Sequence, residues 1–126
     1  IYALNLATGA IDWEIHPTHM FEGLETPSLY SASLSVSNDL LFAGSLDGVV
    51  KAFDTRDGTE KWSLDTAVNF TDINGVSGNG GTIDSVGVVV AGDGLLVNSG
   101  YNTFQGVDGR YQAGAGNALL VLGLPR

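Results

Sequence analysis

One short phrase occurs twice in this chain, and its spacing is the strongest constraint on the fold. The first copy, residues 3–13, reads ALNLATGAIDW, and the second copy, residues 52–62, reads AFDTRDGTEKW. Both have the form Ala-x-(Asn/Asp)-x-x-(Thr/Asp)-Gly-x-x-x-Trp, and they begin 49 residues apart. Self-similarity at such a period is typical of solenoids, propellers and other arrays. The repeat therefore predicts an architecture of similar units, and we expect this chain to be the C-terminal piece of a larger one.

Each shared position has a physical role in a tight turn between two strands. The Asn or Asp can accept hydrogen bonds from backbone amides of the turn, and the Gly tolerates the positive φ that a tight hairpin loop needs. The small Ala lets a bulky ring approach, and the Trp supplies apolar area and one N–H donor. We expect each Trp to pack between adjacent units, with stacking on a ligand as the alternative. The predicted docking motif is Ala3, Asn5, Gly9, Trp13, Ala52, Asp54, Gly58 and Trp62.

Turn signals divide the rest of the chain into short strands. The expected strands are 1–5, 10–15, 31–37, 40–45, 48–54, 59–64, 86–91, 95–99 and 118–122. Residues 31–64 then form one four-stranded antiparallel meander, the unit called a propeller blade. We expect residues 1–15 to end one blade and residues 84–124 to form a last blade without its outer strand. The predicted fold is all-β: a single partial domain, 1–126, of about two and a half blades.

The strand directions predict that the two ends of the sheets differ in the length of their connections. The short turns, including Asn38-Asp39 and the Gly-ended loops, fall at one end. The long segments 16–28, 65–83 and 102–115 fall at the other. Val121 matches Ala52 at a spacing of 69 residues, about 20 more than the first period, so the last unit carries an insertion. Because function concentrates on loops held by a rigid scaffold, we expect the functional site at the end with long segments.

Composition excludes several classes of function. The net charge of −9 argues against a nucleic-acid or anionic-membrane partner. The chain has no cysteine, so disulfides and thiolate metal sites are excluded. No apolar run approaches the roughly 20 residues that span a bilayer. We also find no convincing helical periodicity.

The repeated phrase and three further stretches resemble those of a known protein family. The repeated phrase resembles the tryptophan docking motif of quinoprotein-type propellers, the pyrroloquinoline quinone (PQQ) repeat. The stretches 80–85 (GGTIDS), 97–101 (VNSGY) and 116–120 (GNALL) resemble the C-terminal end of polyvinyl-alcohol dehydrogenase-like quinoproteins. WD repeats fit less well, because their period is about 40–45 residues and they carry Trp-Asp, whereas Asp12-Trp13 has the opposite order.

The resemblance implies a propeller of about eight blades with PQQ and calcium in a central funnel. It implies an alcohol dehydrogenase that takes a small alcohol or polyol, in the periplasm or outside the cell. The remaining blades would be the partners of this chain, which would close the propeller, line part of the funnel rim and be inactive alone. No catalytic residue can be transferred. The residues that could approach the cofactor, or serve as turn and packing residues, are Gly81, Asp84, Ser85, Asn98, Ser99 and Tyr101.

Two alternatives stand beside this interpretation. A non-catalytic scaffold is the first: periplasmic lipoproteins of outer-membrane assembly are similar in their blade phrase and bind protein partners. The insertion at 102–115 argues against it, since a plain scaffold should keep the regular period. A metal site at His16 and His19 is the second. Pro17 separates these residues and neither helix nor strand spacing joins them, so we expect an ordinary exposed loop and no metal site.

Overall fold

The computed structural model describes residues 1–101 and 109–123, and these residues form strands and turns with no helix. The first eight strands are β1 (Tyr2–Leu4), β2 (Ile11–Glu14), β3 (Thr18–Phe21), β4 (Leu24–Pro27), β5 (Ser35–Ser37), β6 (Leu40–Gly44), β7 (Val49–Asp54) and β8 (Glu60–Asp65). The others are β9 (Asn69–Thr71), β10 (Ser77–Asn79), β11 (Val88–Ala91), β12 (Gly94–Ser99) and β13 (Ala118–Gly123). The all-β prediction is confirmed for this part of the chain, which also has no helix suited to crossing a membrane.

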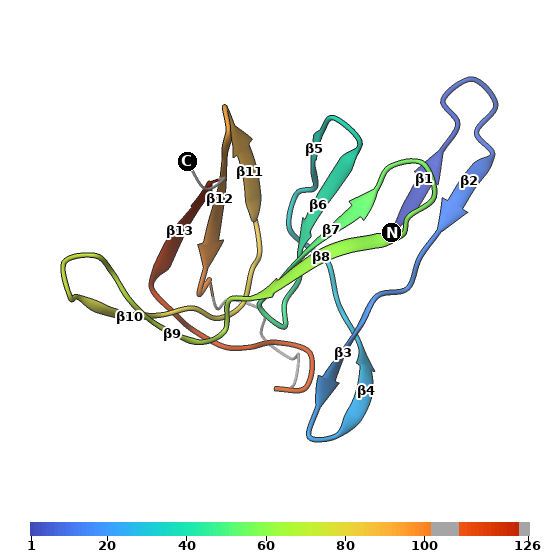
Figure 1. Cartoon of the computed structure of the whole chain (residues 1–126). Helices are drawn as coiled ribbons and strands as arrows, with labels where there is room; N and C mark the ends of the chain where they lie inside the picture. Colours follow the sequence, from blue (N-terminus) through green and yellow to red (C-terminus); the bar gives the residue numbers. More distant parts are fainter. Residues whose placement is uncertain (102–108, 124–126) are drawn as a thin grey trace.

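Three antiparallel sheets stand side by side in the order β1-β2, β5-β6-β7-β8 and β11-β12-β13 (Figure 1). The four-stranded meander predicted for residues 31–64 is the central sheet, although its first strand covers only Ser35–Ser37. Two small hairpins, β3-β4 and β9-β10, project from the long connections between these sheets. The arrangement resembles neighbouring blades, but a closed ring is not part of it.

The two inner strands of the central sheet, β6 and β7, are covered on both faces, which explains why they are mostly apolar. Leu41, Ala43 and Phe53 face the β1-β2 hairpin and pack with Trp13 and neighbouring apolar residues. The alternate positions face β11-β12-β13, where the second core cluster consists of Ala32, Val50, Ile83, Val88 and Val97. Strands that are covered on both sides need apolar residues at consecutive positions rather than at every second one. The sheet is thus a middle layer between two others.

The two copies of the repeated phrase adopt the same local structure. Ala3 lies opposite Trp13 and Ala52 lies opposite Trp62, and a bulge follows the Ala in each copy. The Gly residue of each copy has φ of 73° and donates its N–H to the carbonyl of the Asn or Asp four residues earlier. Asn5 Oδ1 accepts backbone N–H bonds in its turn, and Asp54 Oδ1 does so in the second. The predicted turn chemistry is confirmed.

The first copy docks on the second through Trp13. The indole Nε1–H donates to the Thr55 carbonyl at 2.9 Å. The ring also lies against the bare α-carbon of Gly58, where an added Cβ would come within 3.0 Å of Trp13 Cε3. The predicted packing of this Trp between adjacent sheets is therefore confirmed.

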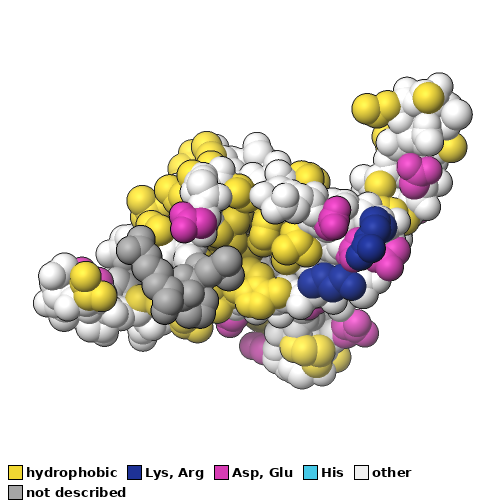
Figure 2. All heavy atoms as spheres, turned by 45° about the horizontal axis from the view of Figure 1, so that its top comes forward, with side chains coloured by type: hydrophobic (Ala, Val, Ile, Leu, Met, Phe, Trp, Pro, Cys, Tyr) yellow, Lys and Arg dark blue, Asp and Glu magenta, His cyan; other side chains and the backbone are white. Residues whose placement is uncertain are grey.

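Trp62 differs from Trp13 because no matching turn among the described residues covers it. Its ring helps to line an open groove between the central sheet and β11-β12-β13, next to Phe42, Leu95 and Leu122. It remains 40% exposed, so the expectation of a ring packed tightly between sheets is only partly met. Figure 2 shows a patch of hydrophobic side chains exposed in the middle of the molecule. The third sheet is the following unit, and its described residues bring no turn onto Trp62 that would repeat the Trp13 contact.

Two of the three long connections, residues 16–28 and 65–83, contain a hairpin that we did not predict. In residues 16–28, Glu22 and Gly23 both have positive φ and form the two-residue turn between β3 and β4. In residues 65–83, a turn from Asp72 to Gly75 joins β9 and β10. Two-residue turns of this kind are a hairpin signal in the sequence. Figure 1 otherwise agrees with the expected arrangement of the connections. The short turns lie at one end of the sheets, toward the top of the view, and the long segments lie away from that end.

Gly58 and Gly9 allow a matched test of the docking contact. Both have φ of 73°, so Ala at either position should cost about 1–2 kcal/mol from backbone strain. An added Cβ at Gly58 would also lie 2.8 Å from Ile15 Cγ2, whereas at Gly9 it would meet nothing within 4 Å. Urea unfolding should therefore show that Gly58→Ala is more destabilising than Gly9→Ala by about 1–3 kcal/mol. Equal losses would contradict the docking contact.

Asp54 should make stability depend on pH. Its hydrogen bonds with the Arg56 side chain and backbone hold the pKa of this carboxyl well below its usual range. A carboxyl with a lowered pKa stabilises the fold above its unfolded value, about 3.9, and that stabilisation is lost as the pH falls. The stability difference between the wild type and Asp54→Asn should therefore be largest above about pH 5 and shrink below about pH 4. Unfolding titrations across this range would measure it, and a difference that does not change with pH would contradict the role.

Candidate functional site

The long-connection end of the sheets gathers four segments that are far apart in the sequence. They are the β3-β4 hairpin, the β6-β7 turn, residues 81–85 and residues 109–117. Backbone bonds join them: Ala113 N–H donates to the Leu46 carbonyl at 2.8 Å, and Ile83 N–H donates to the Ser45 carbonyl at 3.2 Å. This end of the sheets, where we expected function, therefore holds a continuous polar network.

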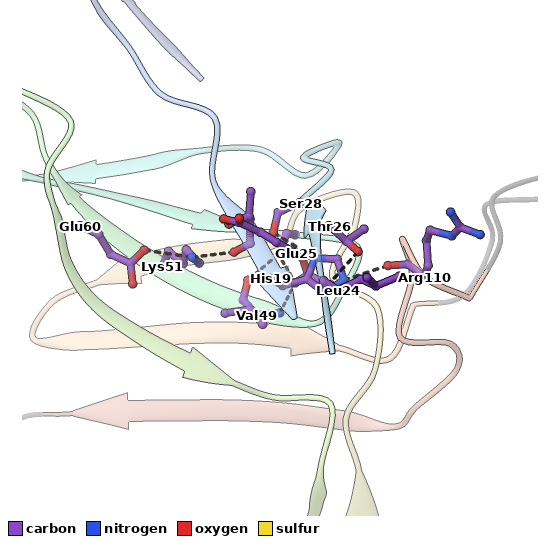
Figure 3. A network of polar contacts seen from close by, with 12 residues as sticks. His19, Leu24, Glu25, Thr26, Ser28, Val49, Lys51, Glu60 and Arg110 are labelled. Carbon is purple, nitrogen blue, oxygen red and sulfur yellow. Dashed lines mark hydrogen bonds and ion pairs between the residues drawn. The ribbon is translucent and has the colours of Figure 1, made fainter. Parts of the chain in front are cut away.

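His19 and Asp47 form the most deeply buried contact between ionisable side chains in this network. His19 lies on β3, and its Nδ1 is 2.9 Å from Asp47 Oδ2 in the β6-β7 turn. The side chains are 13% and 4% exposed. His19 Nε2 is 2.8 Å from the Arg110 carbonyl oxygen, and Figure 3 shows His19 beside Arg110. Burial raises the pKa of the nearby Tyr30 hydroxyl, and the charge on Asp47 raises it further.

A second part of the network consists of buried hydroxyl groups. Thr66 Oγ1 donates to the Gly48 carbonyl at 2.6 Å and lies 2.7 Å from Ser99 Oγ. Ser99 Oγ also accepts the Gly81 N–H at 2.9 Å. Because Thr66 follows β8 and Ser99 ends β12, these hydroxyls tie the central sheet to the third one. Both residues are 1% exposed or less.

Gly81 is surrounded so closely that no side chain could replace its hydrogen. An added Cβ would overlap the Gly114 carbonyl, and Thr82 N–H donates to this same carbonyl at 2.8 Å. Gly114 N–H in turn donates a hydrogen bond to Thr82 Oγ1 at 2.9 Å. Gly81 therefore serves close backbone packing in this structure.

Asp84 joins the segment that precedes the third sheet to the segment that precedes the central sheet. It is 8% exposed, and its Oδ1 accepts hydrogen bonds from Ser31 Oγ and from the Ser85 N–H, both at 2.6 Å. Ser85 itself is exposed and has φ of 60°. Both residues thus act here in a tight turn, with the carboxylate turned toward neighbouring protein groups.

The remaining two predicted site residues are exposed. Asn98 lies on β12 between the buried residues Val97 and Ser99, so it occupies the opposite face of that strand. Tyr101 is 45% exposed, and its backbone N–H donates to the Thr82 carbonyl at 3.0 Å. The insertion predicted at 102–115 falls partly outside the described residues. The structure thus brings Gly81 and Ser99 together and leaves Asn98 apart from them.

The described residues do not fit a calcium site. Among them, no group of three or more His, Asp or Glu side chains is arranged to hold a metal ion. Asp84 and Ser99, the best oxygen donors of the predicted set, are already engaged in hydrogen bonds within the protein. His16 and His19 point to different partners, since His16 pairs with Glu14 at 2.7 Å and is 78% exposed. The cofactor role predicted for this set of six residues stays a prediction.

The sequence comparison found two related enzymes. Polyvinylalcohol dehydrogenase of Sphingopyxis sp. (strain 113P3) is 32% identical over 106 residues, which covers 80% of this chain and 16% of that protein. Polyvinylalcohol dehydrogenase of a Pseudomonas species is 32% identical over 111 residues, with the same two shares. The chain is therefore similar to these enzymes over most of its own length, and it spans 16% of theirs.

Two further comparisons add no argument. No family model matches the chain. The crystal structure of the computationally designed Ika8 protein superposes with a TM-score of 0.49 and 12% identity, covering 98% of this chain and 27% of that one. That similarity is too low to support a conclusion about fold or function.

Sequence reasoning missed the buried pair of His19 and Asp47. We expected an exposed loop around His19, but the β3-β4 hairpin folds its side chain against the β6-β7 turn. The available signal was the Glu22-Gly23 turn, which predicts the hairpin. With four residues on either side, the hairpin makes His19 and Thr26 direct partners. The contact with Asp47 joins residues that are 28 positions apart, and no local sequence pattern predicts such a contact.

Ser99→Ala tests whether the buried hydroxyls are structural. The substitution would leave the Gly81 N–H and the Thr66 hydroxyl without this partner in a dry site, which typically costs about 1–3 kcal/mol. Ser63→Ala on the exposed face of β8 is the matched control and should change stability by less than about 0.5 kcal/mol. Chemical denaturation of both variants measures the difference. If the two variants lose the same amount, the network contributes nothing measurable.

Proposed function

We propose that this chain forms closing blades of a β-propeller dehydrogenase that oxidises alcohols, with polyvinyl alcohol or a smaller alcohol or polyol as substrate. The similarity to two polyvinylalcohol dehydrogenases over 80% of the chain carries this proposal. The periplasmic or extracellular location expected from the resemblance belongs to the same proposal. The relatives are much longer, so the activity is that of the whole protein.

The repeated docking contact supports the propeller. One complete contact lies inside the chain, where Trp13 sits on Thr55 and Gly58. Trp62 borders a groove beside the third sheet, and at Gly9 an added Cβ would meet nothing within 4 Å. The turn at Gly9 is therefore open to a preceding unit, whereas Trp62 already faces the third sheet. A head-to-tail contact of this kind generates a ring when the rotation between units closes.

In this proposal the chain supports the active site without forming its cofactor site. PQQ and calcium are implied by the family resemblance, and the described residues do not assemble a place for the metal. The cofactor ligands are therefore assigned to other parts of the protein. The hydroxyl network at Thr66 and Ser99 and the turn at Asp84 would hold the rim in position.

Activity of the intact protein tests the proposal. The purified protein would be given PQQ and Ca²⁺, and reduction of an artificial dye acceptor would be followed with polyvinyl alcohol, small secondary alcohols and no alcohol. We expect alcohol-dependent dye reduction that disappears when the cofactor or the metal is left out. Bound quinone and calcium would be measured separately by absorption and elemental analysis. If neither binds and no alcohol supports reduction, the protein is a non-catalytic propeller scaffold.

A further inference from the structure

Two Asn-Gly pairs lie at opposite ends of the β9-β10 hairpin. Asn74-Gly75 is in the turn between the two strands, and Asn79-Gly80 is at the point where β10 ends. They are the only Asn-Gly pairs in the sequence. In this dipeptide the backbone nitrogen reaches the asparagine side-chain carbonyl most readily, because glycine has no Cβ to hinder the approach and a freer backbone than other residues. The two pairs thus share one chemistry and differ in their surroundings.

The first pair is exposed at the tip of the hairpin, which extends away from the larger sheets (Figure 1). An added Cβ at Gly75 would meet nothing within 4 Å, so no neighbouring segment packs against this position. The Asn74 side chain has only a long contact, from Nδ2 to Asp72 Oδ2 at 3.5 Å. The Gly75 N–H donates to the Asp72 carbonyl at 3.0 Å within the turn. Exposed turns with few packing contacts open at little cost in free energy, and opening frees this nitrogen.

The second pair is fixed by neighbouring segments. Asn79 Nδ2 donates to the Ala115 carbonyl at 3.1 Å. Gly80 is buried, and its N–H donates to the Val68 carbonyl at 3.0 Å. An added Cβ at Gly80 would overlap the Thr66 carbonyl, so the backbone here is closely packed. Asn79 could turn its side-chain carbonyl onto the Gly80 nitrogen only if these contacts were broken.

We propose that Asn74 is a self-modification site, at which the folded protein converts this asparagine to aspartate and isoaspartate while Asn79 stays intact. The Gly75 nitrogen, after loss of its proton, attacks Asn74 Cγ and forms a succinimide ring. The bond from Cγ to Nδ2 breaks, and Nδ2 leaves as ammonia. Water then opens the ring at either carbonyl, so that a water molecule is consumed for each ammonia released. This inference does not depend on the proposed enzymatic activity.

The modification adds a negative charge to the tip of the hairpin. Asp72 Oδ1 accepts hydrogen bonds from the Asn74 and Val76 N–H groups, both at 2.8 Å, so a carboxylate already lies in this turn. Aspartate or isoaspartate at position 74 would place a second carboxylate beside it and remove the Nδ2 donor. The modified chain is therefore more acidic than the original one, whose net charge is −9, and ion-exchange chromatography can separate the two.

Mass spectrometry of peptides from the intact protein tests the proposal. The protein is incubated at neutral pH in ¹⁸O-labelled water, both folded and in urea, and the labelled fraction at each asparagine is followed over weeks. In the folded protein we expect Asn74 to react at least about tenfold faster than Asn79, because the second site reacts only after local unfolding. In urea the two sites should react at similar rates, because their neighbouring segments no longer hold them.

Asn74→Gln is the matched variant, because a glutamine side chain would have to close a larger ring, which forms more slowly. It should stay unlabelled at position 74 and leave the rate at Asn79 unchanged. Isoaspartate at position 74, detected with an isoaspartyl methyltransferase, identifies the succinimide route, because direct hydrolysis of the side chain gives only aspartate. Equal rates at Asn74 and Asn79 in the folded protein, or labelling of Asn74 in urea alone, would overturn the proposal.

Discussion

The docking of one indole on the next turn is the contact on which the rest of this structure depends. Trp13 joins the first hairpin to the central sheet by a directed N–H bond to Thr55 and by ring contact with Gly58. Both partners belong to a turn whose shape is held by Asp54, which accepts bonds from Arg56. This turn conformation presents the Thr55 carbonyl and the bare α-carbon of Gly58 to the ring. The same residues therefore build the hairpin and create the binding surface for the preceding unit.

Local chemistry made much of the fold predictable from the sequence. Turns rich in Gly, Asn and Asp separate short apolar runs, and the strands of the β1-β2 hairpin, the central sheet and the third sheet lie within a few residues of their expected bounds. The hairpins β3-β4 and β9-β10 were missed because their strands are short and carry no steady alternation. Trp62 shows another limit, since the sequence predicts the same role for both indoles. Whether a ring is covered depends on a neighbour that lies far away in the chain.

The candidate site was less predictable because its contacts are non-local. Thr66 and Ser99 are separated by 33 residues and meet only when two sheets pack together. Among the predicted residues, Gly81 and Asp84 lie at the expected end of the sheets, but their polar groups bind the protein itself. The sequence identified positions that matter for packing, and it could not distinguish a carboxylate that faces a ligand from one that faces a serine.

The bulge in each copy of the hairpin has a consequence for which side of the sheet the indole occupies. In the second copy, Phe53 pairs with Glu60 and Ala52 pairs with Trp62, so Lys61 is the additional residue. An uninterrupted ladder would place Lys61 opposite Ala52 and turn the indole to the reverse side, away from the third sheet. Bulges also increase the local twist of a strand pair. The one additional residue, Asp12 in the first copy and Lys61 in the second, thus sets the side of the sheet from which each indole reaches toward the next unit.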